Sequence, residues 1–134
     1  MRPLRIALAQ CRQTAVIDEN ERTILRFLDE AAAAGAQIVC FPETQTQGYR
    51  VDIATPETPV DAERLETLHA RVADKCRELQ IACILGTETP LETTPHGKPY
   101  NTAIVFDSSG GLLGKHHKTR LTPLDAVAYS PGST

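Results

Sequence analysis

The sequence has 134 residues, of which 41% are hydrophobic and 4% aromatic, so it has the length of about one domain and enough apolar residues for a core. Its 14 basic and 17 acidic residues give a net charge of −3 without a basic block, which argues against a nucleic-acid partner. No apolar run approaches the roughly 18 residues that span a membrane, and the start MRPLRIALAQ lacks a signal-peptide pattern, so we expect a cytoplasmic protein without a membrane partner.

The first predicted elements are a strand and a helix. Residues Leu4 to Gln10 form a largely apolar run that predicts a strand. Asp18 and Glu21 have the spacing of a capping box, and apolar residues then recur at helical spacing as far as Ala31. Gly35 follows the last of these residues and predicts the end of the helix.

The segment from Ala36 to Tyr49 predicts a buried strand that ends at an acidic residue. Its apolar run stops at Pro42, which has no N–H for the sheet ladder, so Glu43 lies at the carboxyl end of the strand. Ligands bind at that edge of open α/β sheets, which makes Glu43 a candidate site residue. A surface ion pair or a cap would explain an isolated glutamate equally well. Together with the first strand and helix, this strand predicts a right-handed β-α-β unit.

A long loop and a second helix follow. Residues Gln45 to Val60 show no periodicity and predict a loop that is long enough to have a function. Asp61 can cap a helix whose apolar stripe extends to Leu79. His69 lies beside this stripe, and we expect it to be a half-buried packing residue. Residues Ile81 to Gly86 are continuously apolar, as in strands that are covered on both faces.

The last third of the chain predicts a loop and a hairpin. Residues Thr89 to Pro99 contain three prolines and a glycine and predict the loop. Residues Ala103 to Phe106 and Leu112 to His116 predict two strands joined by the turn sequence DSSGG. The elements together indicate an α/β fold.

Several kinds of site lack the spacing that they require. There is no glycine-rich phosphate motif and no G-x-S-x-G elbow, and the adjacent His116 and His117 point to opposite faces of a strand and cannot converge on one metal. The cysteines have neither zinc nor redox spacing, and we interpret them as buried thiols. They are Cys11, Cys40, Cys76 and Cys83. We therefore expect no cofactor and no metal.

The cationic run from Lys115 to Arg120 provides a second candidate group. Alternation along an extended segment places Lys118 on the side opposite to His117. A lysine beside Glu43 would keep that carboxylate ionised and could donate a hydrogen bond to a developing oxyanion. A solvated basic strand end is the alternative interpretation of this run.

Five segments together resemble the nitrilase superfamily of carbon–nitrogen hydrolases. They are RIALAQ near the start, AAAAGAQIVCFPET with Gly48 and Tyr49 behind it, ILGTE at 84–88, YNTAIVFDSSGGLLGKHHK at 100–118, and YSPG at 129–132. Each segment alone is weak evidence. Their order and spacing over residues 4–132 carry the resemblance.

The resemblance implies a Glu-Lys-Cys triad. Glu43 in F-P-E matches the general base, and Lys118 matches the lysine that stabilises the oxyanion of the tetrahedral intermediate. Asp125 stands four residues before Tyr129, where many members have a second glutamate, so it is the candidate second acid. Arg120 stands where members usually have a histidine.

The resemblance also implies that the nucleophile lies outside these residues. In the family the cysteine follows the F-x-P-G motif by several tens of residues, on a strand-to-helix elbow, and none of the four cysteines here has that context. Cys40 lies inside its strand and has no elbow to expose its sulfur. The family fold is a four-layer α-β-β-α sandwich of two similar halves. Residues 1–134 are expected to form the amino-terminal portion of one such domain, truncated before the nucleophile.

The expected function is hydrolysis of an amide, a carbamoyl compound or a nitrile through a cysteine thioester, and we expect the isolated chain to be inactive. The resemblance also implies a homo-oligomer. The alternative is a catalytically inactive fragment that acts as an interaction module with the same half-fold. The coding sequence beyond Thr134 would distinguish the two.

Overall fold

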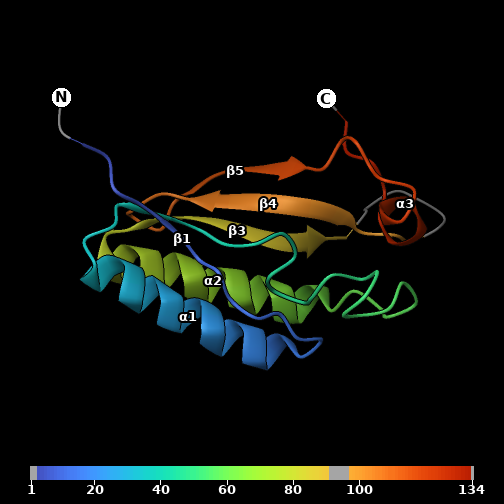
Figure 1. Cartoon of the computed structure of the whole chain (residues 1–134), viewed down its shortest axis with the longest axis horizontal. Coiled ribbons are helices and arrows are strands. Elements are labelled where there is room, and N and C mark those ends of the chain that lie inside the picture. Colours follow the sequence, from blue (N-terminus) through green and yellow to red (C-terminus); the bar gives the residue numbers. More distant parts are fainter. Residues whose placement is uncertain (1–2, 91–96, 134) are drawn as a thin grey trace.

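The computed structural model describes residues 3–90 and 97–133, and Figure 1 shows one sheet with two long helices on one side of it. The elements, in chain order, are β1 (Ile6–Leu8), α1 (Ile17–Ala33), β2 (Ile38–Cys40), α2 (Ala62–Leu79), β3 (Ala82–Thr89), β4 (Tyr100–Phe106), β5 (Leu112–His117) and α3 (Asp125–Ala128). The predicted α/β fold is confirmed.

The five strands lie in the order in which they occur along the chain, β1-β2-β3-β4-β5. The first three are parallel because α1 and α2 return the chain to the starting edge, while β3, β4 and β5 are antiparallel neighbours. The predicted β-α-β unit and the hairpin are therefore confirmed. Because β4 runs opposite to β3 and β5 runs opposite to β4, β5 runs in the same direction as β2 and β3. It therefore ends at the same edge of the sheet as β2.

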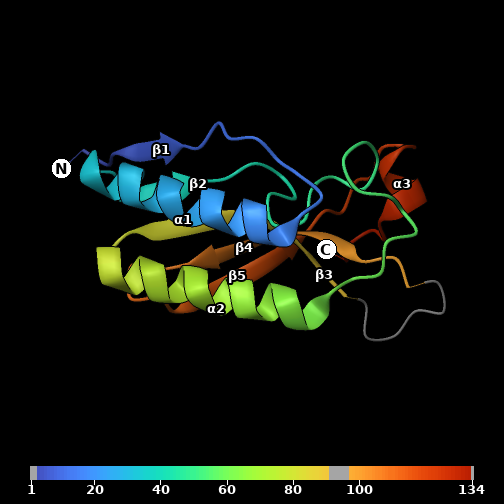
Figure 2. The same cartoon turned by 90° about the horizontal axis from the view of Figure 1, so that it is seen from below.

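The core lies between the sheet and the two long helices, which Figure 2 shows side by side. Val39 of β2 lies between Ala7 and Cys83 of the neighbouring strands, and these side chains face the helices. The helices contribute apolar stripes at helical spacing to the same cluster. The buried members of these stripes are Ile24, Leu28, Ala31, Leu68, Val72 and Cys76.

The opposite face of the sheet is open within the described residues. Ile6 and Leu8 alternate with the core-facing Ala7, and these two residues are 52% and 80% exposed. Ile84 of β3 is only half-buried, so the expectation that this strand is covered on both faces does not hold for this chain alone. The structure thus contains one helix layer and one sheet layer, which is half of the four-layer sandwich. An uncovered apolar sheet face favours association.

The predicted capping box at the start of α1 is wrong. The helix begins at Ile17, its N-cap is Val16, two residues before the predicted cap, and no side chain caps it. Asp18 and Glu21 instead bind arginines of α2. Arg64 reaches both carboxylates, and Arg71 donates to Glu21 over 2.5 Å. An ion pair between packed helices has replaced the local cap, which spacing along one helix could not reveal.

Replacing Glu21 with Gln should lower the free energy of unfolding by about 1 kcal/mol at pH 7, because it removes a buried charge partner of two arginines. Burial alone would raise the pKa of Glu21, but the bonds from Arg71 and Arg64 outweigh burial and lower it. The stabilisation is therefore present above the ordinary pKa of a glutamate and is lost as the pH falls through the lowered pKa. Urea unfolding of E21Q and wild type should converge at low pH. The exposed Glu19 in the same turn provides the control E19Q, and equal losses in both variants would contradict this role.

Several element boundaries differ from those predicted. β1 is shorter than the expected Leu4–Gln10, whereas β3 continues to Thr89, the first residue of the expected loop. Part of that loop, residues 91–96, lies outside the described residues. Asp61 caps α2 as predicted, by accepting a hydrogen bond from the Arg64 N–H, and Gly35 follows α1 with φ +75°. None of the described helices combines the length and the apolar character needed to cross a membrane.

Candidate active site

Glu43 lies at the carboxyl end of β2, as predicted. The ladder continues for one residue beyond the strand, where the Phe41 N–H donates to the Ile84 carbonyl over 2.9 Å, and it stops at Pro42. The turn that carries Glu43 presses against Gly86 of β3. A Cβ atom at Gly86 would lie 2.0 Å from the Pro42 carbonyl oxygen and 2.8 Å from Glu43 Cα. Glycine at this position therefore permits the close approach that places the carboxylate.

Replacing Gly86 with Ala should displace the turn that carries Glu43, because the atoms in its way belong to the backbone. We expect the free energy of unfolding to fall by about 2 kcal/mol, the usual cost of overpacking. Gly114→Ala is the matched control, since a Cβ atom on that strand glycine meets nothing within 4 Å. Chemical denaturation measures both variants. A G86A protein as stable as G114A would contradict the role given to Gly86.

Lys118 follows the last residue of β5 and lies at the same edge as Glu43. Its backbone N–H donates to the Asn101 carbonyl over 2.8 Å. Its ammonium Nζ is 3.0 Å from Glu43 Oε1 and 3.0 Å from Asp125 Oδ2, so one cation joins two carboxylates. Burial alone would lower the pKa of Lys118, but the bonds to Glu43 and Asp125 raise it. The lysine is therefore charged at neutral pH.

Asp125, the first residue of α3, is completely buried yet fully hydrogen-bonded. Its Oδ1 accepts from the Tyr49 hydroxyl over 2.5 Å, and its Oδ2 accepts from the backbone and hydroxyl of Thr122 as well as from Lys118. Burial alone would raise the pKa of Asp125, but the bonds from Tyr49, Thr122 and Lys118 hold it far below its usual range. The carboxylate is thus ionised and rigid.

These three groups share one pocket of about 560 Å³. Sequence reasoning set all cysteines aside, but Cys11 lines this pocket too. Its thiol donates to Gln45 Oε1 over 3.2 Å, and burial raises its pKa, so the neutral thiol is favoured. Cys40 lies within β2, as expected. Neither cysteine has the geometry of an activated nucleophile.

Two polar residues of the site were missed by sequence reasoning. Asn101 donates from its amide Nδ2 to Glu43 Oε1, the oxygen that also accepts from Lys118. Tyr49 holds Asp125, and its pKa is raised by burial and by the bond to that carboxylate, so it remains a donor. Both residues lie in segments that carry the family resemblance, but their sequence positions do not indicate these partners. The contacts depend on how the strand ends meet.

Comparison with known proteins identifies the family to which this chain belongs. A family profile described as "Carbon-nitrogen hydrolase" matches residues 5–134. The chain is 34% identical over 126 residues to the omega-amidase NIT2 of Xenopus tropicalis and 30% identical over 128 residues to that of Homo sapiens. Each match covers 93% of this chain and 43% of the relative, so the chain spans less than half the length of these relatives.

Solved structures show the same fold over half their length. The chain superposes on an amidase from Nesterenkonia sp. with a TM-score of 0.78 and 26% identity, covering 98% of this chain and 49% of that one. A mutant of an amidase from Nesterenkonia sp. AN1, solved in complex with butyramide, matches with a TM-score of 0.79 at the same identity and coverage. This chain belongs to the carbon–nitrogen hydrolases of the nitrilase superfamily.

Proposed function

We propose that this chain forms half of an amidase active site, in which Glu43 and Lys118 serve a cysteine supplied by the other half. The single observation that supports this best is the Lys118 ammonium, 3.0 Å from both Glu43 Oε1 and Asp125 Oδ2 beside an open pocket. The term "completed enzyme" means this half joined to the half that carries the thiol. Its substrate would be a small amide, with carbamoyl compounds and nitriles as further candidates.

Glu43 would act as the general base through its second carboxylate oxygen. Oε1 already accepts from Lys118 and Asn101, and within the described residues no hydrogen bond engages Oε2. Oε2 would take the proton of the thiol as sulfur attacks the carbonyl carbon. The same proton would pass to the departing amine, and Glu43 would then take a proton from the water that hydrolyses the thioester.

Lys118 would stabilise the negative oxygen of each tetrahedral intermediate. An ammonium has three donors, of which one points to Glu43 and one to Asp125, so the third is available for the substrate oxygen. The buried Asp125 would be a positioning residue that keeps Lys118 charged and directed. The shorter acid at this position takes its hydrogen bonds from Tyr49 and Thr122.

The open face of the sheet suggests where the half that carries the thiol packs. Ile6 and Leu8 expose apolar surface that a second sheet would bury, and the chain spans about half the length of the relatives it matches. A second sheet layer packed on this face would bring residues from the other half next to the strand ends. We propose that the nucleophile enters the pocket in this way.

The test is ammonia release from butyramide, acrylamide, a carbamoyl amine and an aliphatic nitrile, measured with the 134-residue chain and with the completed enzyme. We expect turnover of at least one amide by the completed enzyme and none by the chain alone. Trapping of an acyl group on the cysteine, seen as a mass increase of the intact protein, identifies the thioester. Absence of turnover and of trapping for every amide would contradict the proposal.

The second candidate function is an interaction module without catalysis. The exposed apolar sheet face favours it, because that surface could bind a protein partner instead of a catalytic half. Turnover of the completed protein distinguishes the two functions. A module would leave the completed protein inactive toward all four substrates, while Leu8→Lys on the open face would abolish its association.

A further inference from the structure

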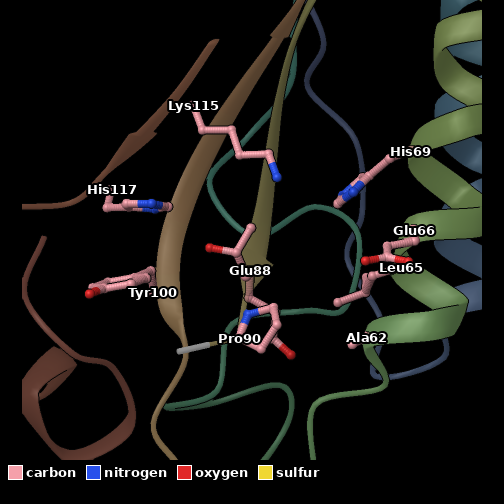
Figure 3. Close-up of a pocket in the computed structure, with 10 residues that line it drawn as sticks. Ala62, Leu65, Glu66, His69, Glu88, Pro90, Tyr100, Lys115 and His117 are labelled. Atoms are coloured by element: carbon pink, nitrogen blue, oxygen red, sulfur yellow. The ribbon is translucent and has the colours of Figure 1, made fainter. Parts of the chain in front are cut away.

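A second pocket lies on the helix-covered side of the sheet, apart from the candidate active site. It encloses about 390 Å³ between the start of α2 and the ends of β3, β4 and β5 (Figure 3), and it shares no lining residue with the Glu43 pocket. Consecutive residues of an extended chain point to opposite faces. His117 accordingly lines this pocket, whereas the next residue, Lys118, reaches the active site.

Lys115 of β5 provides the positive charge of this pocket. Its side chain extends from the strand into the pocket, with the ammonium directed toward the α2 wall that carries Glu66 and His69 (Figure 3). None of the ion pairs formed among residues 3–90 and 97–133 includes Lys115. The other lysine at this end of β5, Lys118, pairs with two carboxylates.

The other titratable groups leave the charge of Lys115 largely uncancelled. Glu88 binds Arg50 with both carboxylate oxygens, at 2.5 and 2.7 Å, so it is neutralised within the protein. Burial, with a contribution from Lys115, lowers the pKa of His69 to about 4, and burial with Lys115 also lowers the pKa of His117. Both imidazoles are neutral at pH 7. Among the pocket residues that the structure describes, only the exposed Glu66 on the rim opposes the lysine.

The other residues that line the pocket suit a small ligand that has an apolar part. The rings of Tyr100 and His117 stack with their centroids 4.2 Å apart, and Leu65 stands across the pocket from them (Figure 3). His117 Nδ1 pairs with the Thr102 hydroxyl, which leaves Nε2 for a ligand. The described walls thus offer one cation outside any ion pair, two neutral imidazoles and apolar side chains, which together match a small organic anion.

We propose that this pocket binds a small organic carboxylate, whose charged end pairs with the Lys115 ammonium and whose apolar body lies between Leu65 and the Tyr100–His117 pair. The site is independent of the Glu43 pocket and does not rest on the proposed amidase activity. Inorganic phosphate is also an anion but has no apolar body, so it should bind more weakly.

Butyrate and butyramide are suitable probes because they differ in charge and hardly in size. Imidazole signals of His69 and His117, followed by NMR in histidine-labelled protein, report binding at this pocket. We expect butyrate to shift both signals in a saturable way and butyramide to leave them unchanged. Equal shifts with butyramide, no saturable shift with butyrate, or equally tight binding of phosphate would overturn the assignment.

Three variants test whether the Lys115 ammonium binds the carboxylate of the ligand. Lys115→Met should weaken butyrate binding about tenfold or more, as expected for loss of a charge-assisted hydrogen bond. Glu66→Gln keeps the lysine and removes the opposing charge, so it should tighten binding about twofold. Lys75→Met removes a lysine that pairs with Asp29 and Glu78 elsewhere on the surface and should change nothing. Wild-type affinity in K115M, or weaker binding in E66Q, would contradict the proposal, and E66Q decides if K115M fails to fold.

Discussion

Replacing Glu43 with Gln is expected to slow thioester formation in the completed enzyme by about 10³-fold, or roughly 4 kcal/mol in the barrier. Glutamine keeps the size of the side chain and can still accept from Lys118 and Asn101 through its amide oxygen. It cannot take a proton from the thiol, because its amide is not basic. The loss should therefore appear in the acylation rate and not in the stability of the fold.

The measurement is the single-turnover rate of acyl-enzyme accumulation on butyramide, followed by intact-protein mass spectrometry. Glu57→Gln is the matched control, since Glu57 is an exposed glutamate in the loop that follows Glu43. We expect E57Q to acylate at the wild-type rate. A wild-type rate in E43Q would remove Glu43 from the role of general base.

Lys118→Met should lower both activity and stability. The variant lacks the donor for the oxyanion, which we expect to cost about 10²- to 10³-fold in kcat. It also leaves the buried carboxylate of Asp125 without its cation. Tyr49 and Thr122 still donate to that carboxylate, so the free energy of unfolding should fall by about 2 kcal/mol and not by the full cost of an unpaired buried charge.

The pH dependence of stability follows from the two shifted pKa values. The pKa of Lys118 is raised, so its stabilising contribution is present below the ordinary lysine pKa and is lost as the pH rises through the raised value. The pKa of Asp125 is lowered, so its contribution is present above the ordinary aspartate pKa and is lost as the pH falls through the lowered value. Both contributions are therefore complete at neutral pH.

Urea unfolding at pH 7 measures the loss in K118M. Lys75→Met is an informative control because Lys75 also pairs with two carboxylates, Asp29 and Glu78, but these are on the surface. We expect K75M to lose about 0.5 kcal/mol or less. A K118M protein that loses no more than K75M would show that Asp125 does not depend on the lysine.

The order and type of the elements could be predicted because they depend on local patterns. Helical spacing of apolar residues, Gly35 after α1 and the Asp61 cap of α2 are properties of neighbouring residues, and the structure confirms each of them. The capping box at Asp18 failed for the opposite reason. Its carboxylate and that of Glu21 find stronger partners in Arg64 and Arg71, which lie on another helix and are close only after packing.

The site was predicted in part. Glu43, Lys118 and Asp125 were identified through the family resemblance, and the structure places them in one pocket. Asn101 and Tyr49 were not assigned roles, because an amide or a phenol is common in strands and loops and nothing in its neighbours indicates its partner. Cys11 was interpreted as a buried thiol by its type; it is half-buried against the core and also lines the active-site pocket.

The sequence by itself determined which segments form helices and strands, and that Glu43 follows β2 and Lys118 follows β5, since periodicity, proline and glycine act within a few residues of the chain. Only the tertiary structure decided that these two strand ends lie at one edge, that Lys118 joins two carboxylates there, and that Lys115 lies in a separate pocket without a carboxylate partner among the described residues. The physical reason is that the two antiparallel turns after β3 restore the strand direction, while alternation along β5 sends neighbouring lysines to opposite sides of the sheet.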